Sequence, residues 1–170
     1  MGLTSPFAAG ASITAAALAS VAPLAGFKFA DQNSGQSNTS LVDDTDLSVA
    51  MLASGTYVFF GFIIYAASTA ADYQAAFTVP SNAQLNWGPY PFIGTGGSSY
   101  STPQNVITGS GTAQAMGGQG TAQNQVATLI GSVVMGAVAG DLQYQFAQNS
   151  SDASNCNTRA GSFLLAWQIA

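Results

Sequence analysis

The chain has 170 residues, enough for one domain whose core needs neither a disulfide nor a metal to stabilise it. Charged residues make up only 5% of the sequence, and two cations, Lys28 and Arg159, stand against seven aspartates for a net charge of -5. The absence of clustered Lys or Arg argues against nucleic-acid binding. The chain has no His and no Glu, and Cys156 is its single cysteine, which excludes Ser/His or Cys/His catalysis and cysteine-based metal sites. No cofactor is therefore expected.

Residues 1–23 predict an N-terminal docking arm that contains a short helix. Ile13, Ala17 and Val21 fall on one helical face, and Pro23 separates this segment from the strand-rich remainder of the chain. The helix either packs on its own domain or docks on a neighbouring protein, and we favour docking. The residues expected to make the contact are Phe7, Ile13, Leu18, Val21 and Leu24. The apolar stretch from Ile13 to Ala25 imitates a signal peptide, but no cation precedes Lys28, so secretion by this route is not expected.

Residues 24–170 predict one all-β antiparallel domain, a sandwich or a barrel, because short strands alternate with turn residues at regular spacing. The predicted strands are Gly26–Ala30, Thr39–Val42, Leu47–Leu52, Thr56–Ala67, Tyr73–Val79, Gln84–Gly88, Gln104–Thr108, Gln125–Ala137, Asp141–Ala147 and Gly161–Ile169.

The segment Tyr57–Tyr65 is apolar at both alternating sets of positions. A strand with one wet face would alternate with polar residues, so both faces must be covered. One face would lie on the core of a sandwich, and a second copy of the chain would cover the other. The predicted subunit-interface residues are Tyr57, Phe59, Phe60, Phe62 and Ile64. The apolar run 57–67 is about half the ~20 residues of a membrane-spanning helix, so no membrane contact is expected.

Two further segments have clear patterns. In Asp141–Ala147 the residues Leu142, Tyr144 and Phe146 alternate with glutamines, which predicts a strand with one polar face. Residues 94–124 are rich in Gly, Ser and Gln and predict a long exposed loop region. Tyr90, just before this region, and Tyr100 within it are candidates for exposed contact residues. Trp87 is a further candidate but fits the core equally well.

The acids suggest little chemistry. Asp43-Asp44-Thr45-Asp46 is the only acidic cluster, and a solvated turn fits it better than a calcium site. A carboxylate pair for glycoside cleavage would have to come from distant residues such as Asp72 and Asp141, so an enzyme is not expected. Arg159 would pair with Asp152 or contact a partner.

Several stretches resemble small virion proteins of tailed phages that infect actinobacteria. In the first half these are Ala30-Asp31-Gln32, Thr39–Leu47 and Gly55-Thr56-Tyr57-Val58-Phe59; in the second half they are Phe77-Thr78-Val79-Pro80, Gly140–Ala153 and Thr158–Leu164. The resemblance covers residues 24–169. It implies a capsid decoration or minor tail protein with a trimeric jelly roll similar to the tumour necrosis factor type, and it implies no catalytic residues.

The favoured function is therefore a capsid decoration protein located on the virion surface. It would be a homotrimer whose arm grips the major capsid protein. The alternative is a tail or fibre-tip protein that binds a host cell-surface glycan through the Gly/Ser-rich loops.

Overall fold

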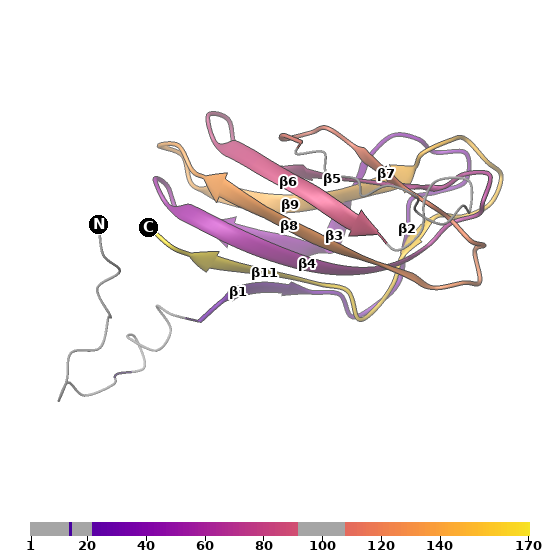
Figure 1. Ribbon diagram of the computed structural model, residues 1–170, viewed down its shortest axis with the longest axis horizontal. Helices are drawn as coiled ribbons and strands as arrows, with labels where there is room; N and C mark the ends of the chain where they lie inside the picture. The colour runs from indigo at the N-terminus through magenta and orange to yellow at the C-terminus, as the bar shows by residue number, and fades with distance from the viewer. Residues whose placement is uncertain (1–13, 15–21, 92–107) are drawn as a thin grey trace.

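A computed structural model describes Thr14 and residues 22–91 and 108–170 (Figure 1). The predicted arm residues Phe7, Ile13, Leu18 and Val21, the arm's helix, Tyr100 and part of the predicted loop region lie outside these residues.

The described residues form an antiparallel two-layer sandwich without a helix, which confirms the predicted fold class. The strands are β1 (Leu24–Phe27), β2 (Gln32–Asn33), β3 (Val42–Met51), β4 (Thr56–Ala66), β5 (Tyr73–Thr78), β6 (Gln84–Pro91), β7 (Gln114–Met116), β8 (Gln125–Val134), β9 (Gly140–Gln148), β10 (Asn157–Thr158) and β11 (Phe163–Gln168).

A seven-stranded sheet, here called the large sheet, contains the strand order β1-β11-β4-β8-β6, with β10 and β2 beside the end of β4. A four-stranded sheet, the small sheet, has the order β3-β9-β5-β7 and lies behind it in Figure 1. Leaving aside β6 and the two-residue strands, the order β1-β11-β4-β8 faces β3-β9-β5-β7. This interleaving of early and late strands is the strand order of a jelly roll.

The core lies between the sheets and is rich in aromatic rings. Phe77 on β5 contacts three of them, with ring centroids 5.0 Å from Phe59, 5.1 Å from Trp87 and 5.3 Å from Tyr144. Phe59 and Trp87 belong to the large sheet and Tyr144 to the small sheet, so Phe77 joins the two layers. The alternation predicted for Asp141–Ala147 is confirmed, because Leu142, Tyr144 and Phe146 are all fully buried.

Two buried tyrosine hydroxyls are satisfied within this core. The hydroxyl of Tyr73 lies 3.0 Å from that of Tyr144 and 2.6 Å from that of Thr158. Burial raises the pKa of both tyrosines well above the ordinary value. The neutral hydroxyls therefore hold β5, β9 and β10 together without introducing a charge.

The observed strands differ from the predicted ones in several places. The two-residue strands β2 and β10 were not predicted, and the predicted strand Gln104–Thr108 lies outside the described residues except for Thr108. In place of the predicted strands Thr39–Val42 and Leu47–Leu52 there is one strand, β3, which starts only at Val42 and continues through the Asp-rich segment to Met51; its pairing with β9 shifts register between Asp43 and Ser48. The predicted loop region 94–124 includes a short strand, β7, which pairs with β5. Asp43–Asp46 is therefore part of a strand and not the predicted turn.

Arg159 pairs with Asp31 rather than with Asp152. Its Nη1 donates to Asp31 Oδ2 at 2.6 Å, and the other oxygen of Asp31 accepts the backbone N–H of Ala160 at 2.8 Å. Asp152 instead accepts hydrogen bonds from Ser68 and Ser154. The pairing with Asp31 ties the β1–β2 connection to the turn before β11.

These contacts predict a pH effect on stability. The N–H of Ala160 and the guanidinium of Arg159 hold the pKa of Asp31 below its ordinary value. Because the pKa of Asp31 is lower in the folded chain than in the unfolded chain, its carboxylate stabilises the fold at pH values above the unfolded-state pKa. This stabilisation is lost as the pH falls through the folded-state pKa. Asp31→Asn should therefore be less stable than wild type at pH 6, and the difference should shrink below about pH 4. Urea unfolding across that range measures it; a pH-independent difference would contradict this assignment. The effect is small because the side chain is half exposed.

Candidate functional site

The outward-facing side chains of the large sheet form an apolar surface. On β4, Tyr57, Phe59, Ile63 and Tyr65 point into the core, so the alternate residues point outward. The strand register places the outward residues of five strands in common rows. We call the apolar part of this surface the apolar face. The same rows also hold the polar residues Gln84, Asn86, Thr128 and Ser132 on β6 and β8. The apolar face consists of Ala25, Phe27, Val58, Phe60, Phe62, Ile64, Tyr90, Val126, Ile130, Val134, Phe163, Leu165 and Trp167.

Aromatic side chains run across the strands of this face. Phe163 pairs directly with both Phe27 and Phe62 in the sheet register. Its ring stacks on that of Phe62 with centroids 5.5 Å apart and lies 6.1 Å from that of Phe60. Such cross-strand pairs stabilise the sheet itself by about 0.2–1 kcal/mol each.

The described part of the chain leaves this face partly open to solvent. The exposed fraction is 38% for Val58, 45% for Ile130 and 46% for Val134, and Phe27 at one edge is 46% exposed. Single exposed apolar residues are ordinary on protein surfaces, but a contiguous apolar patch such as this one, over β1, β11, β4 and β8, marks a contact surface.

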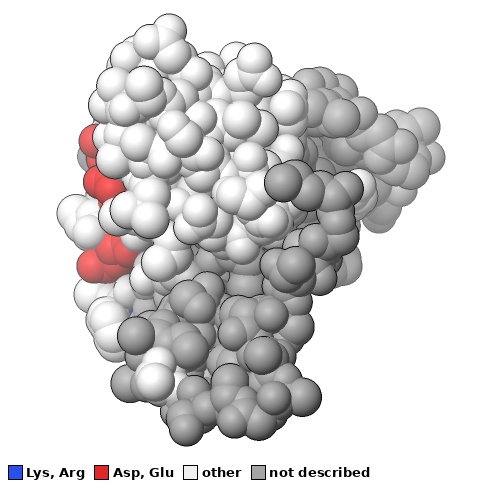
Figure 2. All heavy atoms as spheres, turned by 90° about the vertical axis from the view of Figure 1, so that its left-hand side faces the viewer, with Lys and Arg blue, Asp and Glu red and all other residues white. Residues whose placement is uncertain are grey.

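Charge is divided between the two sheets. Within residues 22–91 and 108–170, no strand of the large sheet contains a charged residue. The small sheet has acids on β3 and β9, and the outward residues Gln74, Gln143 and Gln145 make its surface polar. In Figure 2 the acidic atoms gather along the left margin of the molecule. The protein is therefore two-sided, with one uncharged sheet and one acidic, polar sheet.

The predicted interface residues fall on both sides of β4. Phe60, Phe62 and Ile64 lie on the apolar face, as the alternation requires. Tyr57 and Phe59 are 0% and 3% exposed and belong to the core, so their assignment to the interface is wrong. The prediction treated the strand as one set, although the pleat sends successive side chains to opposite faces.

Most of the apolar face was not predicted. On β11, Phe163, Leu165 and Trp167 alternate with the core residues Leu164 and Ala166, which is the same two-sided apolar pattern as on β4. That signal was present in the sequence. The residues of β1 and β8 had no comparable local signal, because β1 has only four residues and polar residues interrupt the pattern of β8. Only the sheet register places them on this face.

The remaining predicted site residues lie in different parts of the fold. Leu24 opens β1 and is 39% exposed, Tyr90 is 49% exposed on the rim of the apolar face, and Trp87 is a core residue. Asp72 lies beside Asn149 at one end of β9 and Asp141 at the other end, roughly 25 Å away at about 3.3 Å per residue. This pair cannot flank one glycosidic bond.

The described residues contain neither a metal-ligand cluster nor a membrane-spanning helix. Among residues 22–91 and 108–170, no group of three or more His, Cys, Asp or Glu side chains could hold a metal ion. The same part of the chain contains no helix long and apolar enough to cross a membrane.

No protein-family model and no curated protein matches this sequence. Two of the solved structures that match are the Gx strain of infectious bursal disease virus and a mutant VP2 protein of that virus in particles derived from it. Each is 13% identical to this chain and superposes with a TM-score of 0.21. The two matches cover 88% and 87% of this chain, but only 36% and 35% of the viral chains. The chain thus spans about a third of their length, and this weak likeness to a viral capsid protein carries no argument about function.

Proposed function

We propose that this chain is a non-enzymatic structural protein of a virus particle, and more specifically a bacteriophage capsid decoration protein that assembles through its apolar face. The observation that supports self-assembly is the uncharged, mainly apolar outer surface of the large sheet, on a protein whose acids lie elsewhere. The resemblance of residues 24–169 to virion proteins of actinobacterial phages supports a role in a virus particle.

A second copy of the chain is the partner that suits this surface. The apolar face can pack against a neighbouring copy without burying a charge of its own sheet, and the acidic small sheets then remain in water, where their negative charges repel least. The apolar face is continuous over four strands at about 4.8 Å spacing and is about 20 Å long between Val58 and Ile64 on β4, or roughly 400 Å² in projection. This is about half of the ~800 Å² of accessible surface that each partner buries in a stable interface. The trimer follows from the likeness to the tumour necrosis factor type of jelly roll.

The docking of residues 1–23 on the major capsid protein completes the proposal. β1 begins at Leu24, so the arm leaves the domain from an edge strand of the large sheet, next to Phe27 of the apolar face. A contact with the shell through the arm would leave the acidic small sheet free.

Labelled particles test this proposal. Val138 is 53% exposed between β8 and β9, so a Val138→Cys variant offers a surface thiol for maleimide gold. The native thiol of Cys156 is fully buried, and burial raises its pKa to about 12, so it should not compete for the label. Electron microscopy should find gold over the whole head; gold confined to the tail would support the tail-protein alternative and overturn the decoration role.

A further inference from the structure

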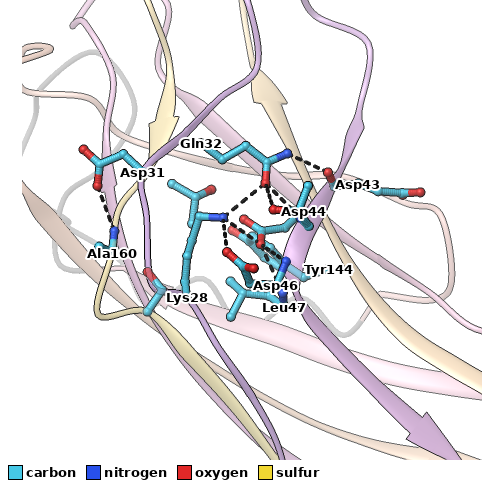
Figure 3. Close-up of polar contacts among 12 residues, drawn as sticks. Lys28, Asp31, Gln32, Asp43, Asp44, Asp46, Leu47, Tyr144 and Ala160 are labelled. Carbon is cyan, nitrogen blue, oxygen red and sulfur yellow. Dashed lines mark hydrogen bonds and ion pairs between the residues drawn. The ribbon is translucent and has the colours of Figure 1, made fainter.

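The only lysine of the chain lies in a buried acidic cluster between the sheets (Figure 3). Lys28 follows β1, and its side chain is fully buried. Its Nζ donates to Asp44 Oδ1 at 2.9 Å, to Asp46 Oδ2 at 3.3 Å and to Gln32 Oε1 at 3.1 Å. The side chain of Asp44 is also fully buried, whereas that of Asp46 is a third exposed.

The two oxygens of Asp44 have different surroundings. Oδ1 accepts the backbone N–H groups of Asp46 at 3.0 Å and of Leu47 at 3.1 Å, besides the ammonium of Lys28. Oδ2 is buried and has no hydrogen-bond partner among the described residues. Two backbone N–H groups on one oxygen of a carboxyl group form the arrangement that stabilises an oxyanion during acyl transfer. The other oxygen is unrestrained.

The reacting atoms are also close. Since Nζ lies 2.9 Å from Oδ1 and the C–O bond adds about 1.2 Å, the distance from Nζ to the carboxyl carbon is at most about 4.1 Å. A near-attack distance is about 3–3.5 Å. Ordinary side-chain motion covers the difference, and both reacting side chains are fully buried.

We propose that Lys28 and Asp44 condense to form an intrachain isopeptide bond. The buried ion pair first becomes a neutral pair, when one proton moves from Nζ to Asp44 so that Oδ2 becomes a hydroxyl. Nζ then attacks the carboxyl carbon, and the negative charge that develops on Oδ1 is held by the N–H groups of Asp46 and Leu47.

Proton transfer through Asp46 completes the step. Its carboxylate takes a proton from Nζ and passes it to Oδ2, the carbon–Oδ2 bond breaks, and one water leaves. The products are an amide and water, so one carbon–nitrogen bond replaces one carbon–oxygen bond without an oxidant or a reductant. Three buried or half-buried charges become one.

The bond would fix the strand that follows the N-terminal segment. β1 has four residues and, among the described strands, pairs with β11 alone; short edge strands are among the first elements to open. A link from Lys28 to β3 joins β1 to the small sheet. If residues 1–23 make the contact with the particle, this link prevents a force on residues 1–23 from separating β1 from β11. The bond itself does not depend on that function.

Intact-mass spectrometry of the folded, full-length protein tests the proposal. The wild-type mass should be lower than the sequence mass by one water, and trypsin should fail to cleave after Lys28. Fragmentation should give a branched peptide that joins Lys28 to Asp44. A wild-type protein with the full sequence mass after prolonged incubation at neutral pH would overturn the proposal and leave an ordinary ion pair.

Three variants distinguish the proposed bond from other reactions that lower the mass by one water. Lys28→Met cannot form the amide, and Asp46→Asn lacks the proton carrier, so the first should retain the full sequence mass and the second should lose water far more slowly. Asp43→Asn is the control, because Asp43 is exposed and bonds Gln145 outside the cluster; it should lose water like wild type. Loss of water from folded Lys28→Met would place the reaction elsewhere and contradict the assignment.

Discussion

A Val58→Asp variant is expected to be a folded monomer under conditions in which the wild-type chain is an oligomer. Val58 lies on β4, the strand between β11 and β8, and faces outward with 38% of its surface exposed. In a single chain the new carboxylate reaches water, so the fold persists. In the oligomer each copy would bury it without a partner, which costs about 3 kcal/mol or more and weakens association at least roughly 100-fold. Sedimentation velocity at micromolar concentrations measures the change.

The same substitution at Val138 is the matched control. Val138 is 53% exposed, but it lies in the β8–β9 connection and not on the large sheet. Val138→Asp should therefore sediment like wild type, and circular dichroism should report the same β structure in all three proteins. Equal oligomers for Val58→Asp and wild type would exclude this face as the subunit interface. A wild-type protein that is monomeric at these concentrations would exclude self-assembly altogether.

The sequence predicted the fold class because the strongest strands carry local patterns. The alternation of Leu142, Tyr144 and Phe146 in β9 needs only the two-residue period of a strand, and the structure follows it. The Asp-rich part of β3 was predicted as a turn, since aspartate favours turns in isolation. In the folded chain Asp44 is buried and pairs with Lys28, and this tertiary contact outweighs the local preference of aspartate for turns. Because the two residues are 16 positions apart, no local sequence pattern indicates the contact.

The sequence predicted the part of the apolar face that lies on a single strand, β4. The two apolar sets of β4 indicated that its outer face needed cover. The structure adds that β11, β8 and β1 extend this face, because strand order and register are non-local. The predicted partner of Arg159 was wrong for a related reason. Asp31 lies 128 positions away and Asp152 only seven, so sequence distance favoured a contact that the folded chain does not make.

A Phe77→Ala variant is expected to cause a large loss of stability. Phe77 is fully buried on β5, and its ring contacts Phe59 and Trp87 across the core and Tyr144 beside it in the small sheet. Removal of the ring deletes buried apolar area and leaves a cavity that these rigid aromatic neighbours cannot fill by collapse. The expected cost is about 3–5 kcal/mol, a large part of the roughly 5–15 kcal/mol typical of a domain. Urea unfolding followed by circular dichroism measures it.

Phe29→Ala supplies the contrast for this experiment. Phe29 is 81% exposed and touches only the ring of Phe27 among the described aromatic contacts, with centroids 4.9 Å apart. Its replacement should change the free energy of unfolding by less than about 0.5 kcal/mol. Similar losses for the two variants would mean that Phe77 does not join the sheets as described. A large loss at Phe77 alone would locate the stability of the fold in the aromatic contacts between the layers, since the outer apolar face is intact in both proteins.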